Sequence, residues 1–70
     1  KDNAYMLLGM ALFNLNQFED AQYAFKEAAK SKDSKASATQ WLNYVGKEIE
    51  RRDMLAQTMK AMEAQQPDTN

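Results

Sequence analysis

The side chains in this sequence that could take part in chemistry are carboxylates and lysines. The carboxylates that could act as general acids or bases are Glu19, Asp20, Glu27, Glu48 and Glu50. The chain has no histidine and no cysteine, which excludes Cys–His and Ser–His nucleophiles and the zinc sites built from these residues. Gly9 and Gly46 are isolated, so no glycine-rich phosphate loop is present. We interpret the carboxylates as solvated surface charge and expect no catalytic residue, no metal and no cofactor.

Basic side chains gather in the middle of the sequence. They are Lys26, Lys30, Lys32 and Lys35. Because Glu27 and Asp33 are interleaved with them, a solvated corner is a better interpretation than a phosphate site. Nine basic and ten acidic residues give a net charge of −1, which argues against a general electrostatic role on nucleic acid or an anionic membrane.

The elements that position these residues are predicted to be helices. Good helix formers abound, and the chain contains only two glycines and one proline. No apolar run approaches the ~20 residues of a membrane span. The composition therefore predicts an all-α fold.

Two short helices are expected first, at about residues 3–15 and 18–30. Asp2 or Asn3 can cap the first helix, and Asn16 can adopt the left-handed conformation that a tight turn requires. A turn this short makes the two helices an antiparallel hairpin, which we assign to residues 1–33.

A long third helix is predicted over residues 34–63, with Asp33 or Ser34 as its cap. Apolar side chains recur in it at alternating spacings of four and three, and Glu48 and Arg52 are placed to form an ion pair. Residues 64–70 contain Pro67 and are expected to form a disordered tail.

The hairpin resembles the tetratricopeptide repeat, a unit of roughly 34 residues made of two antiparallel helices. The positions that carry the resemblance are Tyr5, Leu8, Gly9, Leu12, Phe18, Ala21, Phe25 and Ala28. Gly9, Ala21 and Ala28 are the small residues at which two helices can cross closely, and the large ones would fill the space between them. Asn16 replaces the family's turn glycine, and Asp33 stands near its closing proline.

The resemblance implies an α-solenoid fragment in which the third helix is a terminal capping helix. A shift of one repeat length, about 34 residues, aligns Leu8 with Leu42, whereas a shift two residues longer aligns Tyr5 with Trp41. The register therefore stays open. Since the chain also begins without methionine, we expect it to be the C-terminal part of a longer repeat protein.

The resemblance further implies a non-catalytic scaffold that binds a partner peptide or helix on the concave face of the stack. The residues expected there are Asn3, Met6, Met10, Phe13 and Asn14, followed under the shorter shift by Gln40, Tyr44 and Lys47. Met6 and Met10 stand where the family's carboxylate-binding members need polar side chains, so an acidic tail is not the expected ligand. These residues would alternatively pack within the molecule, against an upstream repeat or the third helix.

The alternative function is structural. The first helix is apolar on nearly every side, and such a helix is normally buried all round. Its exposed face, or the stripe of the third helix, would then drive homo-oligomerisation, although Arg52 in that stripe weighs against a coiled coil. The sequence names no partner and is compatible with cytoplasm and periplasm alike.

Overall fold

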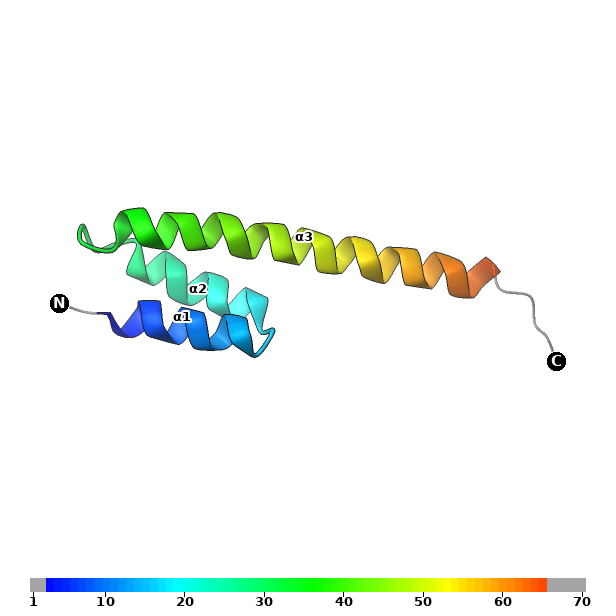
Figure 1. Cartoon of the computed structure of the whole chain (residues 1–70), viewed down its shortest axis with the longest axis horizontal. Coiled ribbons are helices and arrows are strands. Elements are labelled where there is room, and N and C mark those ends of the chain that lie inside the picture. Colours follow the sequence, from blue (N-terminus) through cyan, green and yellow to red (C-terminus); the bar gives the residue numbers. More distant parts are fainter. Residues whose placement is uncertain (1–2, 66–70) are drawn as a thin grey trace.

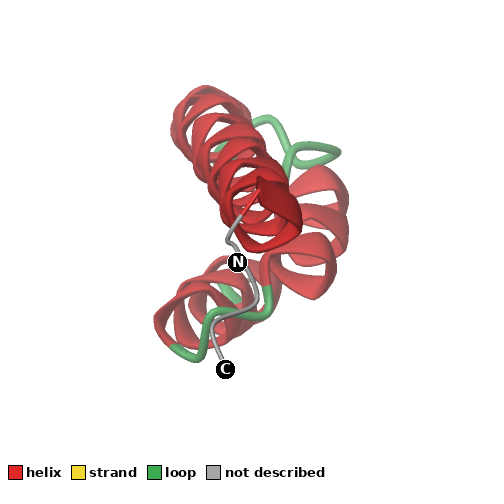
Figure 2. Ribbon diagram, turned by 90° about the vertical axis from the view of Figure 1, so that its right-hand side faces the viewer, coloured by secondary structure: helices red, strands yellow, loops and turns green. Residues whose placement is uncertain are grey.

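The structure is a computed structural model that describes residues 3–65, and this part of the chain consists of three helices (Figure 1). They are α1 (Ala4–Asn14), α2 (Phe18–Ala28) and α3 (Lys35–Gln65). The predicted all-α fold is confirmed, and the two short helices form the expected antiparallel hairpin. Seen along the molecule, α1 and α3 lie on either side of α2, so the three helices form an arc (Figure 2).

The turn between α1 and α2 is closed by Asn16. Its φ of 62° is in the left-handed region, as predicted, where asparagine is one of the few tolerated residues. The Gln17 amide then donates to the carbonyl of Leu12 at 2.9 Å, which satisfies an acceptor at the end of α1. At the other end of α1, Asn3 is the N-cap residue but its side chain makes no capping hydrogen bond. Asp2, the other predicted cap, lies outside the described residues.

The hairpin packs most closely where Gly9 meets Phe25. A Cβ atom built on Gly9 would lie 2.6 Å from the nearest atom of the Phe25 ring, so a glycine is required at this crossing. Phe25 and Ala21 are completely buried, and Ala28 is nearly so. The small-residue crossing expected from the sequence is therefore present.

The prediction that Tyr5 and Leu8 fill the hairpin core is wrong. Tyr5 is 39% and Leu8 46% exposed, whereas Met6 is only 8% exposed and belongs to the core. The helix turns Met6, Gly9 and Phe13 inward, and the predicted Leu12 also packs against the core. Tyr5 and Leu8 are thereby left substantially exposed.

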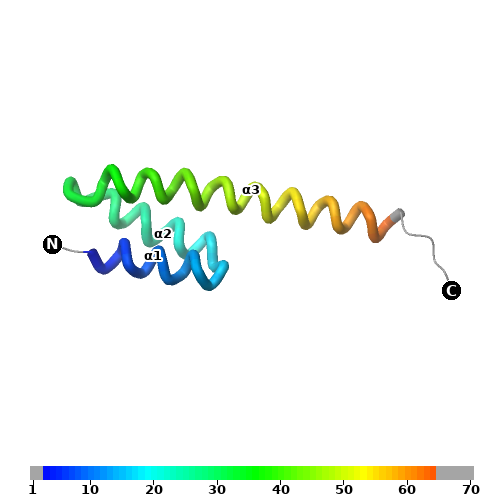
Figure 3. The backbone as a smooth tube through the Cα atoms, in the orientation of Figure 1, coloured from blue at the N-terminus to red at the C-terminus, as the bar shows by residue number. Residues whose placement is uncertain are grey.

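The long helix α3 begins directly after Ser34, whose carbonyl accepts a hydrogen bond from the Ala38 amide at 2.8 Å. Its first half packs on α2 through the completely buried Ala38 and Val45, with Leu42 and Ile49 partly buried beside them. The helix has 31 residues, whereas α1 and α2 have 11 each. Figures 1 and 3 show that α3 therefore continues well past the hairpin.

We call residues 53–64 of α3 the overhang. Every residue from 50 to 64 is exposed, so no side chain of the overhang is buried against another part of residues 3–65. Ala64 and Gln65 are still helical, two positions beyond the predicted end of the helix. The rest of the predicted tail, residues 66–70, lies outside the described residues.

Two further findings concern residues 3–65. None of the helices there combines the length and apolar character needed to span a membrane. Nor does this part of the chain bring three or more acidic side chains into a cluster suited to a metal ion.

Candidate partner-binding groove

An aromatic cluster joins the three helices at the centre of the molecule. Trp41 of α3 stacks on the buried Phe25 of α2, with ring centroids 5.0 Å apart and planes 12° from parallel. Phe13 of α1 reaches the same cluster, at 5.6 Å from Trp41 and 5.2 Å from Tyr44. Such offset and tilted pairs add stability beyond their buried area. The cluster therefore fixes α1 and α3 relative to one another across the inside of the arc.

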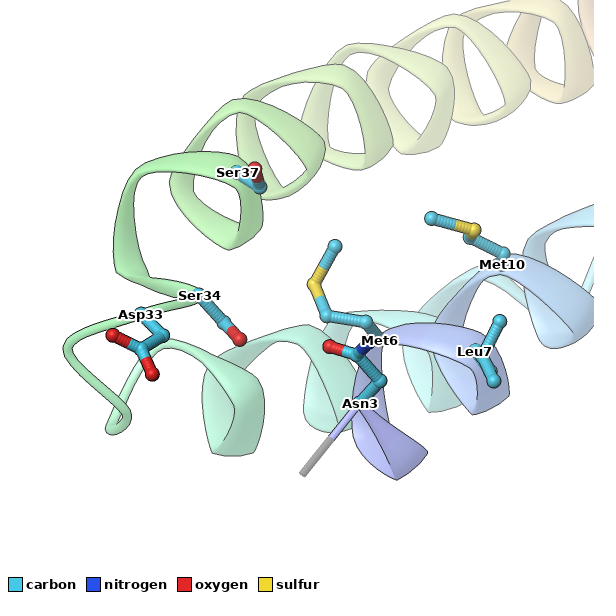
Figure 4. A pocket seen from close by; sticks show the side chains of 7 residues that line it. All are labelled: Asn3, Met6, Leu7, Met10, Asp33, Ser34 and Ser37. Carbon is cyan, nitrogen blue, oxygen red and sulfur yellow. The ribbon is translucent and has the colours of Figure 1, made fainter. Parts of the chain in front are cut away.

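A first hollow lies beside this cluster at the start of α3 (Figure 4). It has a volume of about 200 Å³, and α1 lines it with Asn3, Met6, Leu7 and Met10. Asp33, Ser34 and Ser37 line it from the side of α3. In Figure 4 the Met6 side chain points from α1 toward the beginning of α3. The hollow thus has an apolar wall of flexible thioethers and a polar wall of hydroxyls and a carboxylate.

Two more hollows follow along α3. One, of about 300 Å³, is lined by Gln40, Trp41 and Tyr44. The other, of about 340 Å³, lies where the α1–α2 turn approaches α3 and is lined by Asn16, Phe18, Glu48, Arg51, Arg52 and Leu55.

The three hollows lie along one side of α3. Their α3 residues recur every three or four positions, which places them on a single helical face. We call this surface the groove and define it by Met6, Met10 and Phe13 of α1 together with Ser37, Gln40, Trp41, Tyr44, Glu48, Arg51 and Leu55 of α3. It runs parallel to α3 on the inner side of the arc.

Charged pairs lie at the end of the groove that is nearest the overhang. Arg51 lies 3.7 Å from Glu48 one turn earlier, in a position open to solvent. Arg52 forms a bidentate pair with Glu19 of α2, donating to its two carboxylate oxygens at 3.1 and 2.6 Å. The predicted pair of Glu48 with Arg52 is therefore wrong, because Arg52 faces α2 and Arg51 takes its place.

The Arg52 pair perturbs both partners. The hydrogen bonds from Arg52 lower the pKa of Glu19 below its ordinary value of 4.5. The same hydrogen bonds raise the pKa of Arg52 further above its usual range, with a second contribution from Asp53. Charge-assisted forks of this kind fix geometry more than they add stability when exposed. The pair therefore anchors α3 to the start of α2 at the point where the overhang begins.

Six of the eight residues predicted to bind a partner lie in or beside the groove. Asn3, Met6 and Met10 line the first hollow, Gln40 and Tyr44 the second, and Phe13 contacts the aromatic cluster. Met6 is also part of the core. The remaining two, Asn14 and Lys47, are exposed and line none of the three hollows.

Sequence reasoning missed several groove residues. They are Ser37, Trp41, Glu48, Arg51 and Leu55. The spacing of Tyr44, Glu48, Arg51 and Leu55 contains the signal, since steps of four, three and four mark one face of a helix. The stripe that includes Val45 and Ile49 is more apolar, and it therefore dominates the pattern of α3 and masks this second face.

A second apolar surface lies on the outer side of α1, away from the groove. Tyr5, Leu8 and Leu15 are all substantially exposed there. No part of residues 3–65 covers this face.

Comparisons with protein-family models, with curated proteins and with solved structures gave no match to this chain.

Proposed function

We propose that this chain is a non-catalytic protein-interaction module that binds a partner peptide or helix in the groove. The observation that carries this proposal is the apolar lining shared by two helices, with Met10 and Phe13 on α1 and Trp41 and Tyr44 on α3. An amphipathic helix binds by laying its apolar face into a groove of this kind. Flexible methionines allow such a surface to adapt to its ligand.

The resemblance to the tetratricopeptide repeat supports the same proposal. In that reading α1 and α2 are one repeat unit, and the first half of α3 takes the place of the first helix of the next unit. Repeats stacked in this way form a concave surface to which successive first helices contribute. The groove lies on the inner side of the arc, where that surface would be.

A selection for ligands tests this function directly. Peptides of about 20 residues with helical periodicity would be displayed on phage, selected on the immobilised chain and measured by calorimetry as purified peptides. Met10→Glu places a charge in the groove and should weaken binding at least tenfold, about 1.4 kcal/mol or more. Met10 is preferred to Met6 for this purpose because Met6 is a core residue.

The matched control is Leu8→Glu, which changes an exposed apolar residue on the outer side of the same helix. It should leave peptide affinity unchanged. If no peptide binds, or if selected peptides bind the Met10→Glu variant as tightly as the unchanged chain, the groove is not the binding site.

The second candidate is a structural role as the terminal cap of a solenoid, with an apolar face that drives oligomerisation. The exposed Tyr5, Leu8 and Leu15 on the outer side of α1 favour it, because large apolar patches mark interaction surfaces. Under this hypothesis Leu8→Glu abolishes self-association in sedimentation equilibrium, whereas Met10→Glu does not. Association that persists in Leu8→Glu would reject this candidate.

A further inference from the structure

The apolar stripe of α3 changes sides along the helix. In the first half, Ala38, Leu42, Val45 and Ile49 face α2. If the same face is continued into the overhang, it carries Lys60, Glu63 and the small Ala56, and no large apolar side chain. The large apolar residues of the overhang that share a stripe are instead Leu55, Met59 and Met62, each more than half exposed.

This second stripe continues the groove. Steps of three and four lead from Tyr44 through Glu48 and Arg51 to Leu55, and further steps of four and three lead to Met59 and Met62. Leu55 already lines the last hollow of the groove, beside Phe18. Whatever covers the overhang must therefore lie along the same side of α3 as the occupant of the groove.

We propose that this occupant is a second copy of the chain. Two α3 helices pair antiparallel about a two-fold axis, so that the overhang of each copy lies in the groove of the other. The inference rests on the proposed function, since it requires that the groove accept a helix. It adds the identity of that helix and makes the interface reciprocal.

The charges of α3 set the register of this pairing. When the two-fold axis passes between Glu48 and Arg51, Glu48 lies opposite the partner's Arg51, and the second copy of the pair forms by symmetry. In the same register Tyr44 lies opposite the partner's Leu55 and Gln40 opposite the partner's Met59. One further turn places Ser37 opposite the partner's Met62. Opposite charges thus meet at the centre and apolar side chains meet the groove on both sides.

The far end of this register also fits. Ser37 belongs to the first hollow, whose other wall is Met6, Leu7 and Met10. The partner's Met62 therefore arrives at an apolar hollow of about 200 Å³ rather than at solvent. Thioether against thioether is an adaptable contact that tolerates irregular gaps.

The lengths of the two surfaces agree as well. The overhang has a length of about 18 Å at 1.5 Å per residue, and α1, the opposite wall of the groove, has 11 residues and a length of about 16 Å. One overhang thus spans the groove beside α1. The charged residues of the overhang's other faces, Asp53, Lys60 and Glu63, stay in water.

The test exploits the symmetry of the central charges. Glu48→Arg places arginines opposite each other, and Arg51→Glu does the same with glutamates, so each variant alone should dissociate at least about tenfold more readily than the unchanged chain. When the two variants are mixed, every facing pair is again of opposite charge. Sedimentation equilibrium at tens of micromolar should then show monomers for each variant alone and a heterodimer for the mixture.

This design separates the interface from the internal pair of Glu48 and Arg51 on one helix. Loss of that internal pair would weaken α3 within each chain, and mixing could not repair it. Circular dichroism of each variant checks that the helices are retained. A mixture that stays monomeric, or single variants that remain as dimeric as the unchanged chain, would overturn the proposal.

A second pair of variants probes the apolar part. Leu55→Glu should abolish the dimer, whereas Met54→Glu, at the neighbouring and more exposed position outside the stripe, should leave it intact. Dimers that survive Leu55→Glu but are lost in Leu8→Glu would place the interface on the outer side of α1 instead. A monomeric unchanged chain that still binds selected peptides in the groove would reject this inference and leave the proposed function standing.

Discussion

The two halves of α3 differ in what holds them. Up to Arg52 the helix is anchored to the hairpin by Ala38 and Val45, by the stacking of Trp41 on Phe25, and by the fork from Arg52 to Glu19. Beyond that point the helix continues with every side chain exposed through residue 64. One helix thus contains a half whose apolar stripe is packed within residues 3–65 and a half whose stripe is not.

The apolar residues of the two halves of α3 therefore have different roles. In the first half the stripe points to α2 and accounts for the fold. In the overhang that face carries Lys60, Glu63 and only the small Ala56, while the large apolar side chains of the second stripe lie on the side of the groove. Most helical stability in proteins comes from packing of an amphipathic face, and the proposed second copy would supply that packing for the second stripe.

Removing a comparable side chain from each half should produce the largest difference. Val45 is completely buried, so Val45→Ala should lower the free energy of unfolding by about 2 kcal/mol through lost burial and the cavity left behind. Met54→Ala, in the exposed half, should change it by less than about 0.5 kcal/mol. Urea unfolding of both variants in the Glu48→Arg background reports the single chain, and equal effects would refute the division of α3.

Alanine substitutions at the two glycines, one in each of α1 and α3, should change the free energy of unfolding by an intermediate amount. Gly9→Ala brings a methyl group against the Phe25 ring and should cost about 1–2 kcal/mol, even though alanine favours helix. Beyond its chain neighbours and its own helix backbone, Gly46 has no atom within 4 Å of its potential Cβ, so Gly46→Ala should stabilise the chain by about 0.5–1 kcal/mol. Thermal unfolding of the two variants measures both changes in stability. A stabilising Gly9→Ala would show that α1 and α2 are not packed as closely as described.

The smallest expected effect concerns the Glu19–Arg52 pair, which holds α3 against α2 where the two halves of α3 meet. A carboxylate whose pKa is lowered on folding contributes stability above its unfolded value, and this contribution is lost as the pH falls through the folded value. The Glu19–Arg52 pair should therefore weaken as the pH falls below 4.5, the ordinary pKa of Glu19. Comparing urea unfolding at about pH 6 and about pH 3, Glu19→Gln should lose less stability on acidification than the unchanged chain.

Its matched control is Glu50→Gln, which alters an exposed carboxylate of α3 elsewhere and should follow the unchanged chain. If Glu19→Gln loses as much stability on acidification as the unchanged chain does, the pair between Glu19 and Arg52 does not form in solution.

Local signals in the sequence predicted much of the fold. Asn16 indicated a left-handed turn, and Gly9, Ala21 and Phe25 indicated a close helix crossing, because each of these features depends on a few neighbouring residues. The orientation of α1 could not be predicted in the same way. Its residues are apolar on nearly every side, so periodicity did not distinguish a core of Met6 and Phe13 from one of Tyr5 and Leu8.

The candidate site was predictable in part. Met10, Gln40 and Tyr44 followed from the repeat resemblance and do line the hollows. The partner of Arg52 was not predictable, since Glu19 lies 33 positions earlier and meets it only after the chain has folded back. The groove side of the overhang was not predictable either, because it depends on which face of α3 packs on α2.

The central claim is that the overhang depends on a second copy while the first half of α3 does not. Hydrogen exchange measured by mass spectrometry over a range of protein concentrations tests it most directly. We expect protection of residues 53–64 to rise with concentration in the unchanged chain and to stay low in Glu48→Arg, while residues 38–49 are equally protected throughout. Exchange of residues 53–64 that is independent of concentration and identical in both proteins would contradict the account.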